Sequence, residues 1–369
     1  MWYVGNMTQE QHPFDEFTPQ TPTTDTNDSL NDEPVEASFA SSPSSTSHRK
    51  SEVVDAQIVD QAVPRESSRR QPRERRKALP VILFGLTCVS IFWVGTTNWM
   101  PNQVLFASSF LRDSVPLYHA LQNYWDRGLM YMLCVLAILL THEMGHFVAT
   151  ICHKIRASLP YFLPFPFNFF GTFGAVITMD AMKANRREMF DIGIAGPIAG
   201  LIVAVPVMLY GVLTLDLTQP AGGGIALDMP LAVRWMLDYY QPKGYEPGAQ
   251  VWITQLNPFF MAGWLGFLVT GLNMLPVSQL DGGHITYTLF GKAAHWVARV
   301  FMVLVIAYFV YVGGHVMWLM LVLVLMLGID HPPTSDDSVP IGWFRTALGY
   351  ASLSIPLLCF PPQVLTFVR

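Results

Sequence analysis

Three polar residues of this chain, His142, Glu143 and His146, stand at metal-ligand spacing inside a long apolar run. On a helix, residues i and i+4 share a face, so both imidazoles can bind one ion while Glu143 lies close to the ion's open position. This spacing is typical of zinc-dependent hydrolysis, in which the glutamate is the general base for water. A single buried histidine is common in a helix bundle, but a charged side chain at a membrane-helix centre costs roughly 2.5–3.5 kcal/mol. Three polar groups at ligand spacing therefore favour a metal site.

A second polar cluster follows a later apolar run and reads Asn-Met-Leu-Pro-Val-Ser-Gln-Leu-Asp-Gly-Gly-His over residues 273–284. A catalytic zinc takes three protein ligands and keeps a fourth position for water, and the first cluster supplies only two ligands. Asp281 offers the third, since the glycines beside it allow a close backbone approach. Asp-Gly-Gly is also an ordinary turn sequence, and that interpretation stays open. We expect one Zn²⁺ per chain.

The elements that must position these residues are long apolar helices. The chain has 369 residues, of which 51% are hydrophobic and 13% charged, and this composition is typical of polytopic membrane proteins. Apolar runs of near-spanning length predict an all-α bundle of about six to seven transmembrane helices. They lie at about 79–99, 128–151, 190–215, 252–275, 298–313, 315–329 and 342–360.

The N-terminal segment has a different composition. Residues 1–60 hold eleven Asp and Glu against one Arg and one Lys, and they are rich in Ser, Thr, Pro and Asn, so we expect a disordered tail. A basic run at 65–77 comes directly before the first apolar run. Nucleic acid is a possible partner for such a run, but its position favours an orientation signal that holds the N-terminus in the cytoplasm. We predict three regions: an acidic tail at 1–76, a membrane domain at 77–360 and a short C-terminal tail at 361–369.

The charges between the runs predict on which side the two polar clusters lie. With the N-terminus inside, the second run ends on the cytoplasmic side, where the next loop carries Lys154, Arg156 and Lys183. The fourth run returns to that side and ends near Asn273, so both clusters are expected at the same membrane face. Arg187 and Asp191, four apart at the start of the third run, are spaced for a salt bridge.

Together the motifs give a resemblance. The HExxH run, followed by N-x-x-P-x-x-x-L-D-G-G at the end of a later run, resembles the site-2 protease family of intramembrane zinc metalloproteases. Gly171-Thr-Phe-Gly174 is similar to a glycine-bearing segment of that family, and Ala195-Gly-Pro-Ile-Ala-Gly200 to its third-helix signature. The likeness covers roughly residues 80–360 and is strongest to the branch with extra flanking helices that includes plastid and bacterial members. The loop at 216–250 is too short for the peptide-binding PDZ module of other relatives.

The resemblance implies a role for each matching residue. His142, His146 and Asp281 would hold zinc, and Glu143 would activate water. Asn273 would orient substrate or stabilise the oxyanion, although a helix cap is the alternative.

It also implies a small β segment near 157–180, partly inserted in the membrane. Gly171, Thr172, Phe173 and Gly174 would then belong to a strand that pairs with the unwound substrate, whereas a flexible loop is the alternative. Such pairing is physically reasonable because a membrane helix must be unwound before its peptide bonds are reachable, and an edge strand offers hydrogen bonds to the freed backbone.

We therefore expect an intramembrane zinc endopeptidase that cleaves transmembrane segments of other membrane proteins near the cytoplasmic face. The expected partners are the substrate and the lipid bilayer, with no nucleic acid. A non-catalytic, metal-binding or metal-transporting membrane protein of the same fold is the alternative. The acidic N-terminal segment favours a bacterial cytoplasmic membrane over a plastid one, and the oligomeric state is left open.

Overall fold

A computed structural model describes residues 78–179, 183–222, 224–277, 280–312, 333–361 and 363–367. The predicted acidic tail at 1–76 and the predicted helix at 315–329 lie outside the described residues. The three predicted regions therefore stay predictions.

The described part is mostly helical, as expected. Four stretches are long and apolar enough to cross a membrane: α1 (Ala78–Thr96), α4 (Trp125–Cys152), α5 (Arg186–Leu213) and the stretch Asp281–Tyr308. The last stretch consists of α8 (Asp281–Phe290), a 3₁₀ turn and α9 (Ala294–Val312), and α7 (Pro258–Asn273) is apolar but shorter. The expected count of six to seven spans is not reached by the helices of the described residues.

Shorter helices connect or follow the long ones. They are α2 (Pro101–Leu111) and α3 (Val115–Asn123) before α4, α6 (Leu231–Tyr240) between α5 and α7, and α11 (Trp343–Ser352) and α12 (Ile355–Cys359) near the C-terminus. The predicted run at 342–360 is thus divided into two helices rather than one. Pro356 explains why α12 starts anew, because proline is tolerated in the first turn of a helix but not in its interior.

Two small sheets accompany the helices. In the first, β1 (Tyr161–Phe165) pairs antiparallel with β2 (Gly171–Val176), and this is the small β segment expected near 157–180. The second was not anticipated: β3 (Ile225–Leu227) lies between β4 (Val251–Trp252) and β5 (Leu365–Phe367). Residues of the expected C-terminal tail therefore close a sheet with the loop that joins α5 to α7.

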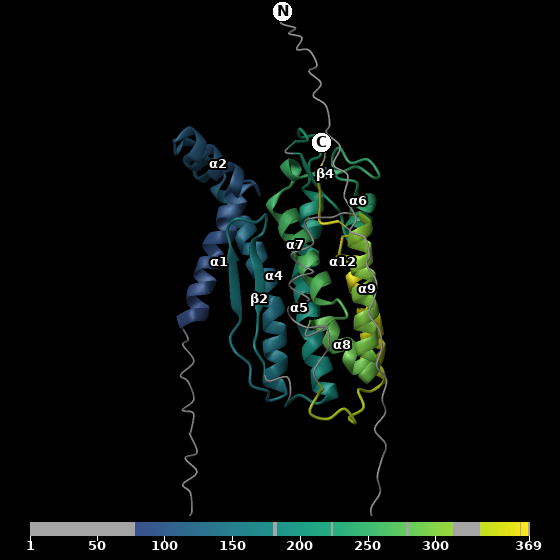
Figure 1. Cartoon of the computed structure of the whole chain (residues 1–369). Coiled ribbons are helices and arrows are strands. Elements are labelled where there is room, and N and C mark those ends of the chain that lie inside the picture. The colour runs from purple at the N-terminus through teal and green to yellow at the C-terminus, as the bar shows by residue number, and fades with distance from the viewer. Residues whose placement is uncertain are drawn as a thin grey trace, which may run out of the picture. The chain divides into compact units, whose positions relative to one another are not determined.

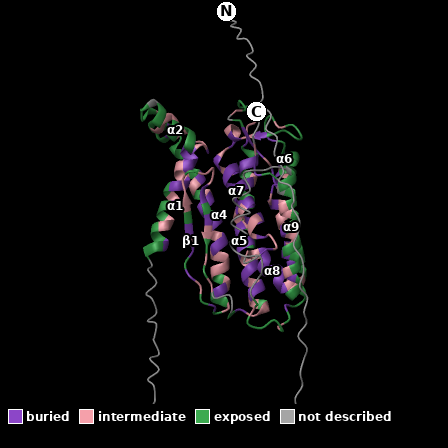
Figure 2. Cartoon of the chain, in the orientation of Figure 1, coloured by how far each residue is buried: buried purple, intermediate pink, exposed green. Residues whose placement is uncertain are grey.

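The core lies where α5 packs between α4 and α7 (Figure 1). Large apolar side chains fill this region, among them Tyr131 of α4, Met208 of α5 and Trp264 of α7, each fully buried. Figure 2 shows the buried residues gathered on α4, α5, α7 and α8, while α9 is largely exposed along its outer face. Exposed apolar faces of this kind suit contact with lipid. The hairpin β1–β2 packs against α1 and reaches α4 through β2.

Truncation after Pro361 should destabilise the sheet that β5 closes. The deleted residues include Gln363, whose backbone N–H donates to Asp228 at 2.9 Å, and the strand that pairs with Ile225–Leu227. Each lost hydrogen bond contributes on the order of 1 kcal/mol, so the unfolding temperature in detergent should fall and proteolysis in the 214–257 loop should accelerate. Lys243→Met, which removes an exposed ion pair of the same loop, is the control. Equal unfolding temperatures for the truncated and full chains would contradict this role of β5.

Candidate metal centre

Three side chains from two helices converge on one point. His142 and His146 lie one turn apart on α4, and Asp281 is the first residue of α8. Their ligand atoms form a nearly equilateral triangle: the two Nε2 atoms are 3.3 Å apart, and Oδ2 of Asp281 lies 3.4 Å from His142 Nε2 and 3.3 Å from His146 Nε2. The structure thus brings together all three ligands expected from the sequence.

This triangle fits a tetrahedral zinc ion. Zinc bonds to imidazole nitrogen and carboxylate oxygen are about 2.0–2.2 Å long, which places the ligand atoms of a tetrahedral site roughly 3.3 Å from one another. Within the described residues, Asp281 Oδ2 is buried and has no hydrogen-bond donor. A buried carboxylate oxygen without a donor is costly unless a cation balances it. The residues present therefore fit the metal that the motif implies.

A backbone carbonyl fixes the orientation of one ligand. Nδ1 of His146 lies 2.8 Å from the carbonyl oxygen of Ile192 on α5 and donates its hydrogen to it. Because Nδ1 carries the hydrogen, the free lone pair is on Nε2, the atom that forms one corner of the triangle. Pro197, in the next turn of α5, has no N–H and removes one helical hydrogen bond from this region.

Glu143 and Asn273 both reach the centre. Glu143 is 6% exposed and lies between the two histidines in sequence. Asn273 is the last residue of α7, and its Nδ2 lies 3.2 Å from Nε2 of His142. Its side chain therefore points to the metal ligands.

A cavity of about 160 Å³ opens beside the ligands, large enough for several water molecules. His142, Glu143, His146, Asn273 and Asp281 all line it. The end of β2 and the residues after it also line the cavity, namely Ala175, Val176, Ile177 and Met179.

The four substrate-contact residues expected from the glycine-bearing segment do not line this cavity. Gly171–Gly174 begin β2, and the Thr172 hydroxyl donates to the Leu163 carbonyl at 2.8 Å within the hairpin. Phe173 is exposed, and Gly171 adopts a φ of +80° against α1. The strand is therefore present as expected, but the residues of it that line the cavity are the last two, Ala175 and Val176.

One further residue of the cavity was not singled out from the sequence. His284 lies in the first turn of α8, is 5% exposed and lines the cavity. The signal was present, because positions 281 and 284 are three apart and therefore share a helix face.

Glycines make room for the ligands. A Cβ at Gly196 would overlap the His146 imidazole, and one at Gly200 would lie 3.0 Å from Nδ1 of His142. A Cβ at Gly282 would collide with the Met274 carbonyl that follows α7. The two α5 glycines thus let the histidine face of α4 approach α5, and Gly282 lets α8 approach the end of α7.

Helices of membrane-spanning length and a buried His-His-Asp centre with an adjacent glutamate define the class: a helical membrane protein with a candidate zinc-hydrolase site. Residues 130–313 match the sequence model of peptidase family M50. The chain contains a peptidase M50 domain, the domain of the site-2 proteases, so the resemblance drawn from the motifs is confirmed.

Several chloroplast proteins are similar to this chain. "Probable zinc metalloprotease EGY1, chloroplastic" of Oryza sativa subsp. japonica is 31% identical over 58% of this chain and 38% of its own length. The protein of the same name in Arabidopsis thaliana is 28% identical over 77% of this chain and 53% of its length. "Probable zinc metalloprotease EGY2, chloroplastic" of Arabidopsis thaliana is 26% identical over 68% and 46%, respectively. The chain spans about half or less of these relatives, and the prediction of a zinc metalloprotease is confirmed at the level of the family.

The expected bacterial cytoplasmic membrane is wrong, because these relatives are named as chloroplast proteins. The expectation rested on an acidic segment. Such a composition shows that the segment is hydrophilic, but it does not show to which membrane the protein is targeted. Targeting signals are read by receptors, so charge composition alone does not reveal them.

The metal content of the purified protein tests the triangle directly. Wild type in detergent should hold near-stoichiometric zinc, and both His146→Ala and Asp281→Ala should lose most of it because each removes one of three ligands. Asp216→Ala removes a carboxylate from the loop between α5 and α7 and should leave the zinc content unchanged. Full zinc content in Asp281→Ala would show that the third ligand lies elsewhere.

Gly196→Ala should weaken zinc binding without touching a ligand. The new methyl group overlaps the His146 ring, and overpacking of about 1–3 kcal/mol corresponds to roughly a 5- to 150-fold higher Kd. Gly85→Ala is the matched control, because a Cβ at position 85 of α1 meets nothing within 4 Å. Competition with a zinc chelator measures both, and equal affinities would contradict the close approach of α5 to His146.

Proposed function

We propose that this protein is a zinc endopeptidase that cleaves transmembrane segments of other membrane proteins. One observation supports it above all: His142, His146 and Asp281 converge within 3.4 Å beside Glu143, on helices apolar enough to cross a membrane. The two histidines and the aspartate hold zinc in this proposal. The peptidase family matched by residues 130–313 is consistent with it.

The side chains around the metal have separate roles. Zinc, when bound, supplies a Lewis acid that makes water more acidic and polarises the scissile carbonyl. Glu143 accepts the proton of the attacking water and then gives it to the leaving amine. Asn273, whose amide nitrogen lies 3.2 Å from His142 Nε2, donates a hydrogen bond to the carbonyl oxygen as charge develops on it.

Substrate binds as an extended strand next to β2. The sheet β1–β2 has two strands, so β2 has a second edge that no other described strand pairs with. That edge ends at Ala175 and Val176 on the wall of the cavity. Gly171–Gly174 then guide the part of the substrate more distant from the ligands, and the hairpin is partly inserted in the membrane between α1 and α4.

In this proposal the chain crosses the membrane six to seven times, when shorter and broken apolar segments are counted together with the four long stretches. The chain from α11 to β5 is one such segment: Arg345 contacts Asp191 near the start of α5, whereas β5 pairs with β3, which follows the end of α5. From Asp191 to the end of α5 at Leu213 the helix rises about 33 Å, so this segment covers a similar distance. Cleavage occurs near the face where α4 ends and where Lys154 and Arg156 lie.

The relatives support a plastid membrane as the location. They are described as probable zinc metalloproteases of the chloroplast, and this chain covers 38–53% of the length of those three proteins. The substrate is a transmembrane protein and the bilayer is the second partner. The alternative of a metal transporter calls for several sites along a path. The described residues contain one cluster of metal-binding side chains, which favours the protease.

Glu143→Gln should abolish cleavage but keep zinc. The amide cannot accept the proton of water, so kcat should fall by roughly 10²- to 10⁴-fold, while the three ligands remain. Reconstitution with a panel of single-pass transmembrane segments, followed by gel and zinc analysis, measures both quantities. Glu246→Gln in the loop between α5 and α7 is the control. Unchanged cleavage by Glu143→Gln would refute the mechanism, and uptake of radiolabelled zinc into the same vesicles would support transport instead.

A further inference from the structure

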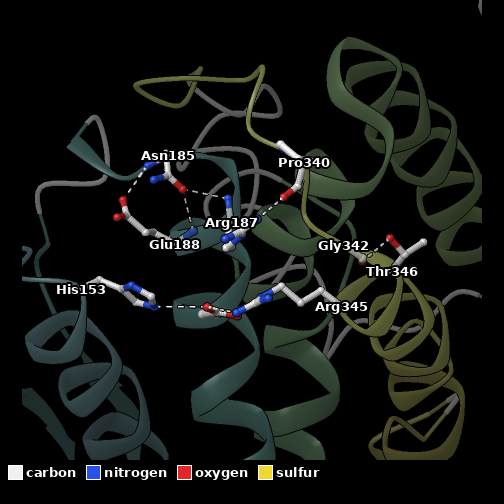
Figure 3. A network of polar contacts seen from close by, with 9 residues as sticks. His153, Asn185, Arg187, Glu188, Pro340, Gly342, Arg345 and Thr346 are labelled. Atoms are coloured by element: carbon white, nitrogen blue, oxygen red, sulfur yellow. Dashed lines mark hydrogen bonds and ion pairs between the residues drawn. The ribbon is translucent and has the colours of Figure 1, made fainter.

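An ion cluster joins the C-terminal end of α4 to α5 and α11 (Figure 3). Arg345 of α11 donates from Nε and Nη2 to the two carboxylate oxygens of Asp191 on α5, at 2.6 and 2.9 Å. Nε2 of His153, which follows the last residue of α4, lies 3.2 Å from Oδ2 of Asp191. The pair expected from the sequence, Arg187 with Asp191, does not form, and Arg187 donates to the Pro340 carbonyl at 3.0 Å.

Arg345 binds the Asp191 carboxylate in a bidentate manner, and the cluster is partly buried. The side chains of Arg345, Asp191 and His153 are 33%, 23% and 26% exposed. A guanidinium fork that matches both carboxylate oxygens fixes direction as well as distance. The charge of this fork is constant at any working pH, because arginine does not lose its proton in proteins.

Asp191 is covalently next to the group that orients a metal ligand. The following residue, Ile192, carries the carbonyl that accepts the Nδ1 hydrogen of His146 at 2.8 Å. A small rotation of this turn of α5 would shift that carbonyl and with it the His146 ring. The outer hydrogen-bond partner of a metal-bound histidine typically changes metal affinity 10- to 100-fold when it is lost.

The same end of α5 also contacts the helix of the third ligand. Arg186 donates to the carbonyls of Thr288 and Leu289 at 2.7 and 3.3 Å, near the end of α8. Asp281 is the first residue of that helix. The first turns of α5 therefore contact α4 through His153 and α8 through Arg186, the two helices that carry the ligands.

We propose that Arg345 is a positioning residue. By binding Asp191 it holds in place the Ile192 carbonyl that accepts the Nδ1 hydrogen of His146, and it thereby sets the affinity of the centre for zinc. This inference rests on the proposed function in one respect: the His142–His146–Asp281 triangle binds zinc. Arg345 itself contacts neither ligands nor cavity.

Zinc titration of Arg345→Met, Arg345→Lys and wild type tests the proposal. Arg345→Met should raise the Kd for zinc at least about 10-fold, and Arg345→Lys should give an intermediate value because it keeps the charge but loses the fork. With Co²⁺ as the probe metal, the visible absorption bands of Arg345→Met should shift, since the ligand field follows the His146 orientation. The matched control is Lys243→Met, which breaks the 2.8 Å pair with Asp216 in the loop between α5 and α7.

Unfolding curves recorded with excess chelator separate positioning from simple stabilisation. An Arg345→Met protein that unfolds earlier but keeps the wild-type Kd and Co²⁺ spectrum would overturn the proposal. A wild type that binds no zinc would instead overturn the proposed function, and this inference with it. Asp191→Asn is the second variant: it should reproduce the effect of Arg345→Met, and combining the two should add little.

Discussion

A carboxylate oxygen buried among apolar helices requires a positive charge nearby, and this requirement explains how the helices around the candidate metal centre pack. Asp281 Oδ2 is buried, lies 3.3–3.4 Å from two imidazole nitrogens, and has no hydrogen-bond donor within the described residues. Three converging ligand atoms in a low-dielectric place are costly unless a cation binds among them. Close helix packing is what makes that convergence possible, and Gly196, Gly200 and Gly282 provide the space for it.

Helix α5 contributes no ligand yet organises the centre. It packs against α4 with its glycine face and supplies the Ile192 carbonyl that orients His146. Its first residues are fixed by a capping box, in which Asn185 accepts from the backbone N–H groups of Arg187 and Glu188 and the Glu188 carboxylate accepts from Asn185. A helix with a fixed start is a suitable reference for ligands that come from two other helices.

The sequence predicted best what depends on local spacing. His142, Glu143 and His146 share one helix, so the period of that helix was sufficient to bring them together. Asp281 lies far along the chain and followed from counting membrane crossings. Contacts between distant segments were missed: Asp191 pairs with Arg345 rather than with its neighbour Arg187, because both α5 and α11 are needed to see that choice.

The register of β2 and the number of helices in the last apolar run could not be predicted from the sequence either. The glycines of Gly171–Gly174 marked the strand, but its register, which brings Ala175 and Val176 to the cavity, depends on pairing with β1. Hydrophobic length alone did not reveal that 342–360 forms two helices. The predicted bacterial cytoplasmic membrane was wrong for another reason, because an acidic composition is not a signal that a targeting receptor recognises.

The pairing of β5 with β3 bears on how the protein is made. Strand β3 leaves the ribosome long before β5, and its edge stays without that partner until synthesis reaches Phe367. Arg345 is likewise synthesised after all three candidate metal ligands. Such long-range contacts form late in folding because the connecting chain must be ordered first. A nascent chain that stalls before α11 therefore lacks both the closing strand and the arginine that contacts Asp191.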